Sequence, residues 1–361
     1  MKLIICFLAI FQLTTISADE YWHIGEYLAK NPKQATILSN FEKLIKSDAK
    51  EISVKQKKKV KIALVYPDLQ ISDYWRRSIL ALKKRLTESK IDYELELIPA
   101  PTGSGKNESS KEIIEAVKKG PDYLIFTLNI NEHSKLVNQI LSYSSIKLIL
   151  LNITTPLKSW GNKQPFFYAG FDHELGTQIL IDDIKKKLPN GGDFIVLYHS
   201  EGYVSRMRGD YAIKQLLKDK KWNLVSRYYT DGQGSNAEIA LKDFFSRKKK
   251  VDLVVSCSTD ISLAARKFKK NSPFLLNGWG GGTAELDSIK NDREGIDLTV
   301  MRINDDSAIA TAEAIKLDLQ GDSQKVPLVY SGEMVLVDKT TSPEKMNSLE
   351  ERAFRYSNEN K

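Results

Sequence analysis

The sequence predicts an α/β fold of two lobes, each built on a doubly wound parallel sheet. Short runs rich in Val, Ile and Leu alternate with amphipathic helical stretches from Lys61 onward, an order typical of parallel strands covered by helices on both faces. The length of 361 residues suits about two domains, each with its own core. Three polar breaks in the pattern indicate that the chain passes between the lobes three times.

The strands are expected where apolar residues run continuously rather than in alternation, because a strand buried on both faces has no polar side. The predicted strands are Ile62–Tyr66, Tyr93–Ile98, Tyr123–Leu128, Lys147–Asn152, Phe194–Tyr198, Leu224–Tyr229, Leu253–Ser256 and Phe274–Leu276. The predicted helices between them are Asp73–Leu86, Glu112–Lys119, His133–Leu141, Leu175–Lys187, Tyr211–Lys218 and Ala237–Phe245. Ahead of the first strand, apolar residues between Asp19 and Lys50 recur at helical spacing and predict a helical extension packed on a lobe.

The three breaks lie at Thr154–Pro156, at Arg302–Asp306 and at Gly321–Pro327, the last before a β-like segment over Leu328–Val337. Asn304 or Asp305 can cap the helix that follows the second break. We therefore expect hinge crossings at these places. The predicted lobes are 19–153 with 303–328 as the N-terminal lobe, and 154–302 with 329–361 as the C-terminal lobe.

The first 18 residues read as a secretory signal peptide. Lys2 supplies a positive start, Leu3–Leu13 an apolar stretch, and Ser17 and Ala18 the small residues that precede a cleavage site. No later stretch is apolar enough to span a bilayer. The sequence thus predicts export to the periplasm, no direct membrane insertion, and a monomer when free of any membrane partner.

Charge and cysteine content exclude several classes of function. A formal net charge of +8 is moderate, and the densest basic run, Lys55–Lys61, has no interleaved aromatic residues, so nucleic acid is not an expected partner. Cys6 lies in the leader, which leaves Cys257 without a disulfide partner and best explained as a small buried residue. The four histidines lack metal-ligand spacing, and no nucleophile with a base can be assembled, so we expect neither a metal site nor an enzyme.

Polar and aromatic residues gather just beyond the carboxyl ends of the predicted strands, where open α/β sheets bind ligands. Each also has a plainer interpretation. Trp75 can belong to the core, and Asn152 and Thr259 can cap turns. On the surface, Arg208 can pair with Asp210 and Arg302 with Asp305. Trp279 lies among glycines, which favour close backbone approach. The candidate ligand-binding residues are Gln70, Ser72, Trp75, Asn152, Arg208, Thr259, Trp279 and Arg302.

Nine segments of the chain resemble the LuxP family, the periplasmic autoinducer-2 receptors of vibrio-type quorum sensing. The resemblance runs from about Tyr21 to the C-terminus. The segments are Tyr66–Trp75, Asp122–Leu128, Leu151–Pro156, Ser200–Tyr203, Arg208–Asp210, Cys257–Asp260, Asn277–Gly282, Val300–Arg302 and Arg352–Ser357.

The resemblance implies a type I periplasmic binding protein fold with three hinge strands and a receptor function in signal transduction. The eight candidate residues match the family's binding site, and the implied ligand is the furanosyl borate diester form of autoinducer-2. Boron then belongs to the ligand, and no separate cofactor is expected. The implied partner is the periplasmic domain of a membrane sensor histidine kinase.

A second function remains open, because the same fold serves transport. The chain can instead be a periplasmic sugar or phosphosugar binding protein of an ABC transporter. Sugar-transport relatives usually place carboxylates in the cleft, whereas Arg208 and Arg302 favour an anion, since guanidiniums form strong charge-assisted hydrogen bonds with anionic oxygens.

Overall fold

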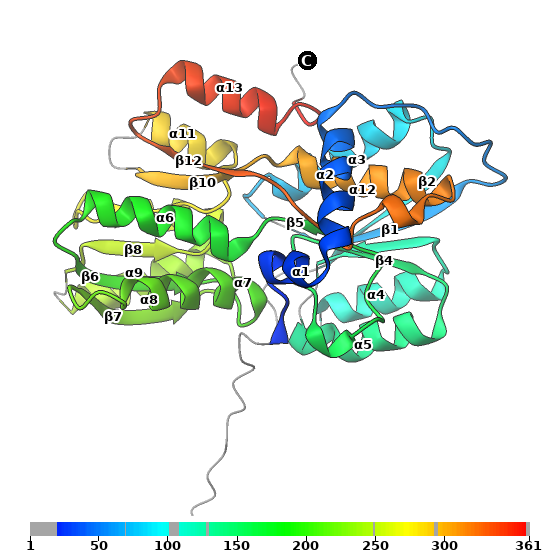
Figure 1. The fold of residues 1–361 in the computed structure, drawn as a ribbon. Helices are drawn as coiled ribbons and strands as arrows, with labels where there is room; N and C mark the ends of the chain where they lie inside the picture. The colour runs from blue at the N-terminus through cyan, green and yellow to red at the C-terminus, as the bar shows by residue number, and fades with distance from the viewer. Residues whose placement is uncertain are drawn as a thin grey trace, which may run out of the picture.

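The computed structural model describes residues 20–68, 70–100, 108–127, 130–247, 250–291 and 295–358. These form two α/β lobes that lie side by side (Figure 1). The predicted signal peptide, 1–18, lies outside the described residues, as does Leu128 at the end of one predicted strand.

The first lobe contains a six-stranded sheet in the order β11-β5-β4-β3-β1-β2, and every neighbouring pair is parallel. Its strands are β1 (Val60–Pro67), β2 (Tyr93–Ala100), β3 (Tyr123–Phe126), β4 (Lys147–Leu151), β5 (Phe167–Gly170) and β11 (Val329–Ser331). Side chains along a strand point alternately to its two faces. Ile62 therefore packs in one core with α2 (Pro32–Lys46), α3 (Tyr74–Glu88) and α12 (Asp305–Leu319), and Ala63 in the opposite core with α4 (Glu108–Lys118) and α5 (Ile130–Tyr143).

The second lobe contains a parallel sheet in the order β7-β6-β8-β9, extended by an antiparallel pair, β10 and β12. Parallel bridges from Asn277 to Leu298 and from Gly280 to Met301 join the two parts. The strands are β6 (Gly192–Tyr198), β7 (Trp222–Tyr229), β8 (Leu253–Ser256), β9 (Leu275–Leu276), β10 (Leu298–Arg302) and β12 (Met334–Asp338). The helices are α6 (His173–Lys187), α7 (Tyr203–Ser205), α8 (Tyr211–Leu216), α9 (Gly234–Ser246), α10 (Thr259–Ala265), α11 (Thr283–Asn291) and α13 (Pro343–Ala353). The predicted fold class is confirmed.

The N-terminal extension is helical, as predicted, and it consists of two helices. α1 (Ile24–Lys30) ends at Lys30, with Asn31 as its C-cap, because Pro32 has no backbone N–H and disfavours a helical conformation in the residue before it. Pro32 then begins α2, whose Phe41 and Ile45 are buried against the first lobe.

The three crossings between the lobes follow β5, β10 and β11, and hydrogen bonds hold them side by side. Gly332 N–H donates to the Gly170 carbonyl at 2.7 Å, and Ile303 N–H donates to the Glu333 carbonyl at 2.9 Å. The second crossing lies within the predicted break Arg302–Asp306.

The other two crossings differ from the predicted lobe boundaries at 153 and 328, since β5 and β11 both pair within the first sheet. Thr154–Pro156 is a buried loop segment inside that lobe, because the chain returns from it to pair β5 with β4. The predicted segment Leu328–Val337 divides at Gly332, which leaves β11 in one lobe and β12 in the other.

The lobes are closed on each other in this structure. Ile71 N–H from the first lobe donates to Asp260 Oδ1 of the second at 2.8 Å. The hydroxyl of Thr283, in the second lobe, donates to Asp73 Oδ2 of the first at 2.7 Å.

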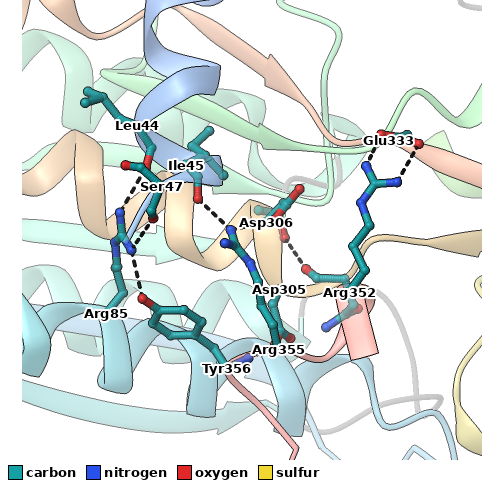
Figure 2. A network of polar contacts seen from close by, with 12 residues as sticks. Leu44, Ile45, Ser47, Arg85, Asp305, Asp306, Glu333, Arg352, Arg355 and Tyr356 are labelled. Carbon is teal, nitrogen blue, oxygen red and sulfur yellow. Dashed lines mark hydrogen bonds and ion pairs between the residues drawn. The ribbon is translucent and has the colours of Figure 1, made fainter. Parts of the chain in front are cut away.

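After α13 the chain returns to the first lobe, and Figure 2 shows the resulting group of contacts. Tyr356 N–H and Ser357 N–H both donate to Asp305 Oδ2 at 2.8 Å, and the Tyr356 hydroxyl accepts from Arg85 at 2.8 Å. We call the contacts that Arg85 and Asp305 make with residues 354–358 the tail network. Across the described parts of the chain, no helix is long and apolar enough to cross a membrane.

Candidate ligand-binding site

The candidate residues lie on loops and helix starts at the junction of the lobes. Asn152 follows β4 and Arg302 ends β10, beside two of the crossings. Arg208 lies in a π-helical segment, Arg206–Asp210, that follows β6 and α7. Thr259 begins α10, and Trp279 lies in the loop after β9.

Arg208 and Trp279 form the centre of the site. The guanidinium carbon of Arg208 lies 3.5 Å from the centre of the Trp279 ring system, and its Nη1 donates to the Cys257 carbonyl at 2.6 Å. The Trp279 indole N–H donates to the Thr177 hydroxyl at 3.2 Å. The guanidinium therefore rests on the aromatic face, where the negative side of the ring system attracts a cation.

Arg302 lies near the same tryptophan but farther from its ring. Its guanidinium carbon is 4.2 Å from the Tyr74 ring centre, 5.7 Å from that of Phe171 and 5.9 Å from that of Trp279. Its Nε is buried without a hydrogen-bond partner among the described residues. A buried guanidinium with a free donor is suited to an acceptor that comes from outside the protein.

The electrostatics of the two arginines reflect this setting. Neither forms an ion pair with a carboxylate among the described residues. Burial, followed by the charge of Arg302, lowers the pKa of Arg208 to about 9, and burial also lowers the pKa of Arg302. Both positive charges are destabilised in the protein without a ligand. A bound anion near them would supply the negative charge and the hydrogen-bond acceptors that the buried guanidiniums lack.

The plainer surface interpretation of these arginines is wrong. Both side chains are 5% exposed. Asp210 instead accepts from the Tyr198 hydroxyl, and Asp305 accepts from the C-terminal residues Tyr356 and Ser357.

The loop that carries Trp279 is held by one buried carboxylate. Glu285 accepts from the backbone N–H groups of Trp279 and Gly281, each at 2.9 Å, and from the Thr299 hydroxyl at 2.6 Å. Gly280 has φ +127, and a Cβ there would lie 2.6 Å from Arg302 Nη2. Glycine is required because a larger residue would both strain the backbone and displace the guanidinium.

The remaining candidates lie nearer the mouth of the cleft. Gln70 and Ser72 are half-buried in the loop between β1 and α3, next to the Ile71 contact with Asp260. Trp75, in the first turn of α3, is 6% exposed and belongs to the core, with its ring centroid 5.1 Å from that of Tyr74.

The structure joins four of the eight candidates through direct contacts. Arg208, Trp279 and Arg302 are linked by their rings and guanidiniums, and the Thr259 hydroxyl lies 3.5 Å from the Trp279 carbonyl. Trp75 reaches Arg302 only through Tyr74.

Sequence reasoning missed three residues of this site, namely His173, Tyr74 and Glu285. His173 is two residues beyond the crossing that follows β5, so recognising β5 as a strand would have marked it as a candidate by position. Tyr74 stands beside the predicted Trp75, and Glu285 carries no signal in the sequence that distinguishes it from a surface carboxylate.

The described residues contain no group of three or more His, Cys, Asp or Glu side chains arranged to hold a metal ion. Cys257 is buried as predicted, and burial raises the pKa of its thiol to about 12. Its carbonyl, rather than its sulfur, contributes to the site. The grouping is one of donors and aromatic faces, which suits binding.

Two hollows lie beside the site. A cavity of about 10 Å³ is lined by residues that include Trp279, Thr177 and Arg208, which is at the lower limit for holding a single water. A groove of about 860 Å³ lies outside the cleft mouth, between Ile71 and the surface of α9, α10 and α11.

A comparison with protein-family models matches residues 62–323 to the periplasmic binding protein domain. Solved structures share the fold at low identity. An ABC transporter solute-binding protein from Bacillus halodurans C-125 with bound myo-inositol has a TM-score of 0.68 at 14% identity, and the match covers 83% of this chain and 100% of that one. A solute-binding protein from Agrobacterium vitis with bound alpha-D-tagatopyranose has a TM-score of 0.69 at 14% identity, with 80% and 98% covered.

A third structure of this fold was solved as the XylFII–LytSN complex, with a TM-score of 0.66 and 14% identity, covering 78% of this chain and 99% of that one. These likenesses show the two-lobed fold. They do not distinguish between ligands.

Proposed function

This chain belongs to the family of periplasmic binding protein domains, and from that premise we propose that its interlobe cleft binds a small, sugar-like anion. The resemblance of the sequence to the LuxP family makes the furanosyl borate diester form of autoinducer-2 the leading candidate. Its tetrahedral borate bears a negative charge, and its furanose oxygens offer acceptors and donors to amides and hydroxyls.

The observation that carries this proposal is the pair Arg208 and Arg302. Two buried guanidiniums lie on or near one tryptophan without a carboxylate partner among the described residues. Arranging two buried positive charges in this way costs stability. The cost has a function if a ligand supplies the negative charge. The buried Asn152 Oδ1, which no described residue contacts by a hydrogen bond, offers an acceptor to a ligand hydroxyl.

We propose that the protein acts in the periplasm as a receptor whose closed form contacts the periplasmic domain of a membrane sensor histidine kinase. Binding at the crossings would favour closure, because the ligand then contacts both lobes. The LuxP resemblance supports this role, and the XylFII–LytSN complex is an instance of the same fold in a complex.

The alternative is a sugar or phosphosugar binding protein of an ABC transporter. Structural neighbours with bound myo-inositol, D-allose and alpha-D-tagatopyranose favour a sugar as the ligand. A neutral sugar leaves the two arginines uncompensated, whereas a phosphosugar would satisfy them. The alternative and the main proposal therefore differ in whether boron is present and in what the closed protein contacts.

The experiment is to purify the protein natively from periplasm, denature it, and analyse the released small molecule by mass spectrometry and elemental boron analysis. Titration calorimetry then compares autoinducer-2 with and without borate against tagatose and myo-inositol. We expect one boron per protein and the tightest binding with borate present. Release of a boron-free neutral sugar that binds more tightly than autoinducer-2 would refute the anion proposal and support the transport alternative.

A further inference from the structure

One buried histidine connects a candidate ligand residue of each lobe. His173 is 1% exposed and begins α6, directly after the crossing that leaves β5. Its Nδ1 is 2.9 Å from Arg208 Nε, and its Nε2 is 3.1 Å from the Asn152 carbonyl. Asn152 belongs to the first lobe and Arg208 to the second, so one imidazole contacts both.

The protonation state of this imidazole follows from its partners. Guanidinium N–H groups only donate, so Nδ1 must accept, and the single ring proton of a neutral histidine is then on Nε2, where it donates to the Asn152 carbonyl. Burial, followed by the charges of Arg208 and Arg302, holds the pKa of His173 well below 6.5. The rings packed on it are Trp279, stacked at 5.0 Å, and Tyr203, edge-on at 5.5 Å.

Asn152 needs the contact that His173 makes. Its φ of +60 places it in the left-handed region, which asparagine tolerates better than most residues but which is still uncommon. Its N–H donates to the Ala169 carbonyl at 2.8 Å, and the hydrogen bond from His173 fixes the orientation of its own carbonyl. The backbone that presents the Asn152 side chain is thus held from both ends.

We propose that His173 is a positioning residue that orients Arg208 toward an anionic ligand and joins this orientation to Asn152 of the opposite lobe. The inference rests on the proposed anion-binding function. It goes beyond that function by assigning the geometry of the Arg208–Arg302 pair, which we call the anion clamp, to a residue outside the eight candidates. His173 acts through Arg208 and Asn152, and it stacks on Trp279 at the same time.

The first test measures affinity for autoinducer-2 with borate in His173→Phe, His173→Asn and His173→Gln. Phe keeps a ring against Trp279 and removes both hydrogen bonds, so affinity should fall about ten-fold or more, as expected on losing a hydrogen bond to a charged group. Asn places an amide oxygen near the position of Nδ1, and Gln places its amide near Nε2. Asn should therefore recover more affinity than Gln.

A matched control is His23→Phe. His23 Nδ1 lies 3.3 Å from Oε2 of Glu174, the residue next to His173 in α6. His23 has no contact with Arg208 or Asn152 among those described above, so its variant should bind autoinducer-2 as the unaltered protein does. Affinity of His173→Phe within two-fold of the unaltered protein would overturn the proposal. If that variant does not fold, equal affinity of the Asn and Gln variants would overturn it instead.

The second test needs no ligand. Histidine 15N spectra of the unaltered protein should show His173 as the neutral Nε2–H tautomer from about pH 7.5 to about pH 5.5, because its ordinary titration near 6.5 is suppressed. An Nδ1–H tautomer, or titration near 6.5, would overturn the placement. Absence of borate-dependent binding by the unaltered protein would instead contradict the proposed function, which separates the two failures.

Discussion

Arg85 and Arg302 are both buried, at 1% and 5% exposure, but the groups around them differ. Arg85 uses every donor of its guanidinium. It donates to Glu313 Oε1 at 2.7 Å, to the Tyr356 hydroxyl at 2.8 Å, and to backbone carbonyls of Leu44, Ser47 and Asp48. Its pKa is raised, because Glu313 and Tyr356 outweigh the effect of burial.

Arg302 has aromatic rings where Arg85 has acceptors. Tyr74, Phe171 and Trp279 surround its guanidinium, and its Nε has no partner among the described residues. Burial lowers its pKa, in contrast to Arg85.

The comparison shows how a buried arginine with a structural role differs from one suited to bind a ligand: the first has protein acceptors and a counter-charge, and the second has neither among the described residues. Around Arg85 the protein supplies a counter-charge, Glu313, and further acceptors, so folding alone satisfies the arginine. Figure 2 shows its contacts with Leu44, Ser47 and Tyr356. Around Arg302 the described residues supply aromatic faces but no acceptor for Nε, and these faces lower the cost of burial without removing it. The same substitution at the two positions should therefore affect different measurements.

The largest expected effect is on ligand affinity in Arg302→Met. Met keeps an apolar stem beside Tyr74 and removes the charge, so affinity for autoinducer-2 with borate should fall by about 2–5 kcal/mol, thirty-fold or more. The free energy of unfolding of the empty protein should not fall by more than about 1 kcal/mol, because the lost charge had no carboxylate partner among the described residues and its burial itself costs stability. Arg302→Lys should recover only part of the affinity, since an ammonium lacks the planar fork. Calorimetry and urea unfolding measure the two quantities, and unchanged affinity would end the case for an anion clamp.

The reverse pattern is expected for Arg85→Met. Glu313 keeps only Lys316, at 2.6 Å, and the carbonyls of Leu44 and Ser47 lose a donor. Unfolding free energy should fall by about 3 kcal/mol, the lower end of the range for breaking a buried pair. Affinity per folded molecule should stay within two-fold. If Arg85→Met lost as much ligand affinity as Arg302→Met, the lack of a protein partner would not distinguish a ligand-binding arginine from any other buried arginine.

The lowered pKa of His173 in the cleft should change how the free energy of unfolding depends on pH. The pKa of His173 is held below its unfolded value of 6.5. Below pH 6.5, His173 therefore binds a proton in the unfolded chain but stays neutral in the folded protein. This contribution to stability is complete above pH 6.5 and is lost as pH falls, at up to about 1.4 kcal/mol per pH unit. Unfolding free energies measured from pH 7.5 to pH 5 should fall less steeply in His173→Phe by that amount. Equal slopes would show that His173 titrates normally in the folded protein.

The fold was largely predictable because its signal is local. The run Ile62–Tyr66 is apolar at every position, as a strand covered on both faces must be, and the structure extends it to Val60–Pro67. β5 was missed because it is only four residues, Phe167–Gly170, and its pairing with β4 is a tertiary property. The crossings depend on that pairing and were displaced for the same reason.

The candidate site was predictable only in part. Positions beyond strand ends and the LuxP resemblance supplied the eight residues, and burial of Arg208 and Arg302 could not be deduced from either. His173 was passed over because a lone histidine has no periodic pattern, and its role exists only once Asn152 and Arg208 have been brought to its two nitrogens. Asn152, His173 and Arg208 come from three separate segments, so no single segment of the sequence carries a pattern that reveals their contacts.

The smallest expected effect tests whether the tail network is purely structural. The Ser357 hydroxyl lies 2.8 Å from Asp305 Oδ1 and 3.3 Å from Arg77 Nη1. Ser357→Ala removes these contacts but leaves Asp305 with two backbone N–H donors, so unfolding free energy should fall by only about 1 kcal/mol. Affinity should not change, although Arg77 also donates to Thr283 across the cleft mouth at 2.9 Å. If Ser357→Ala weakened ligand binding by more than about three-fold, the tail would be part of the closure mechanism, and the division between a structural and a ligand-awaiting arginine would no longer coincide with the two regions.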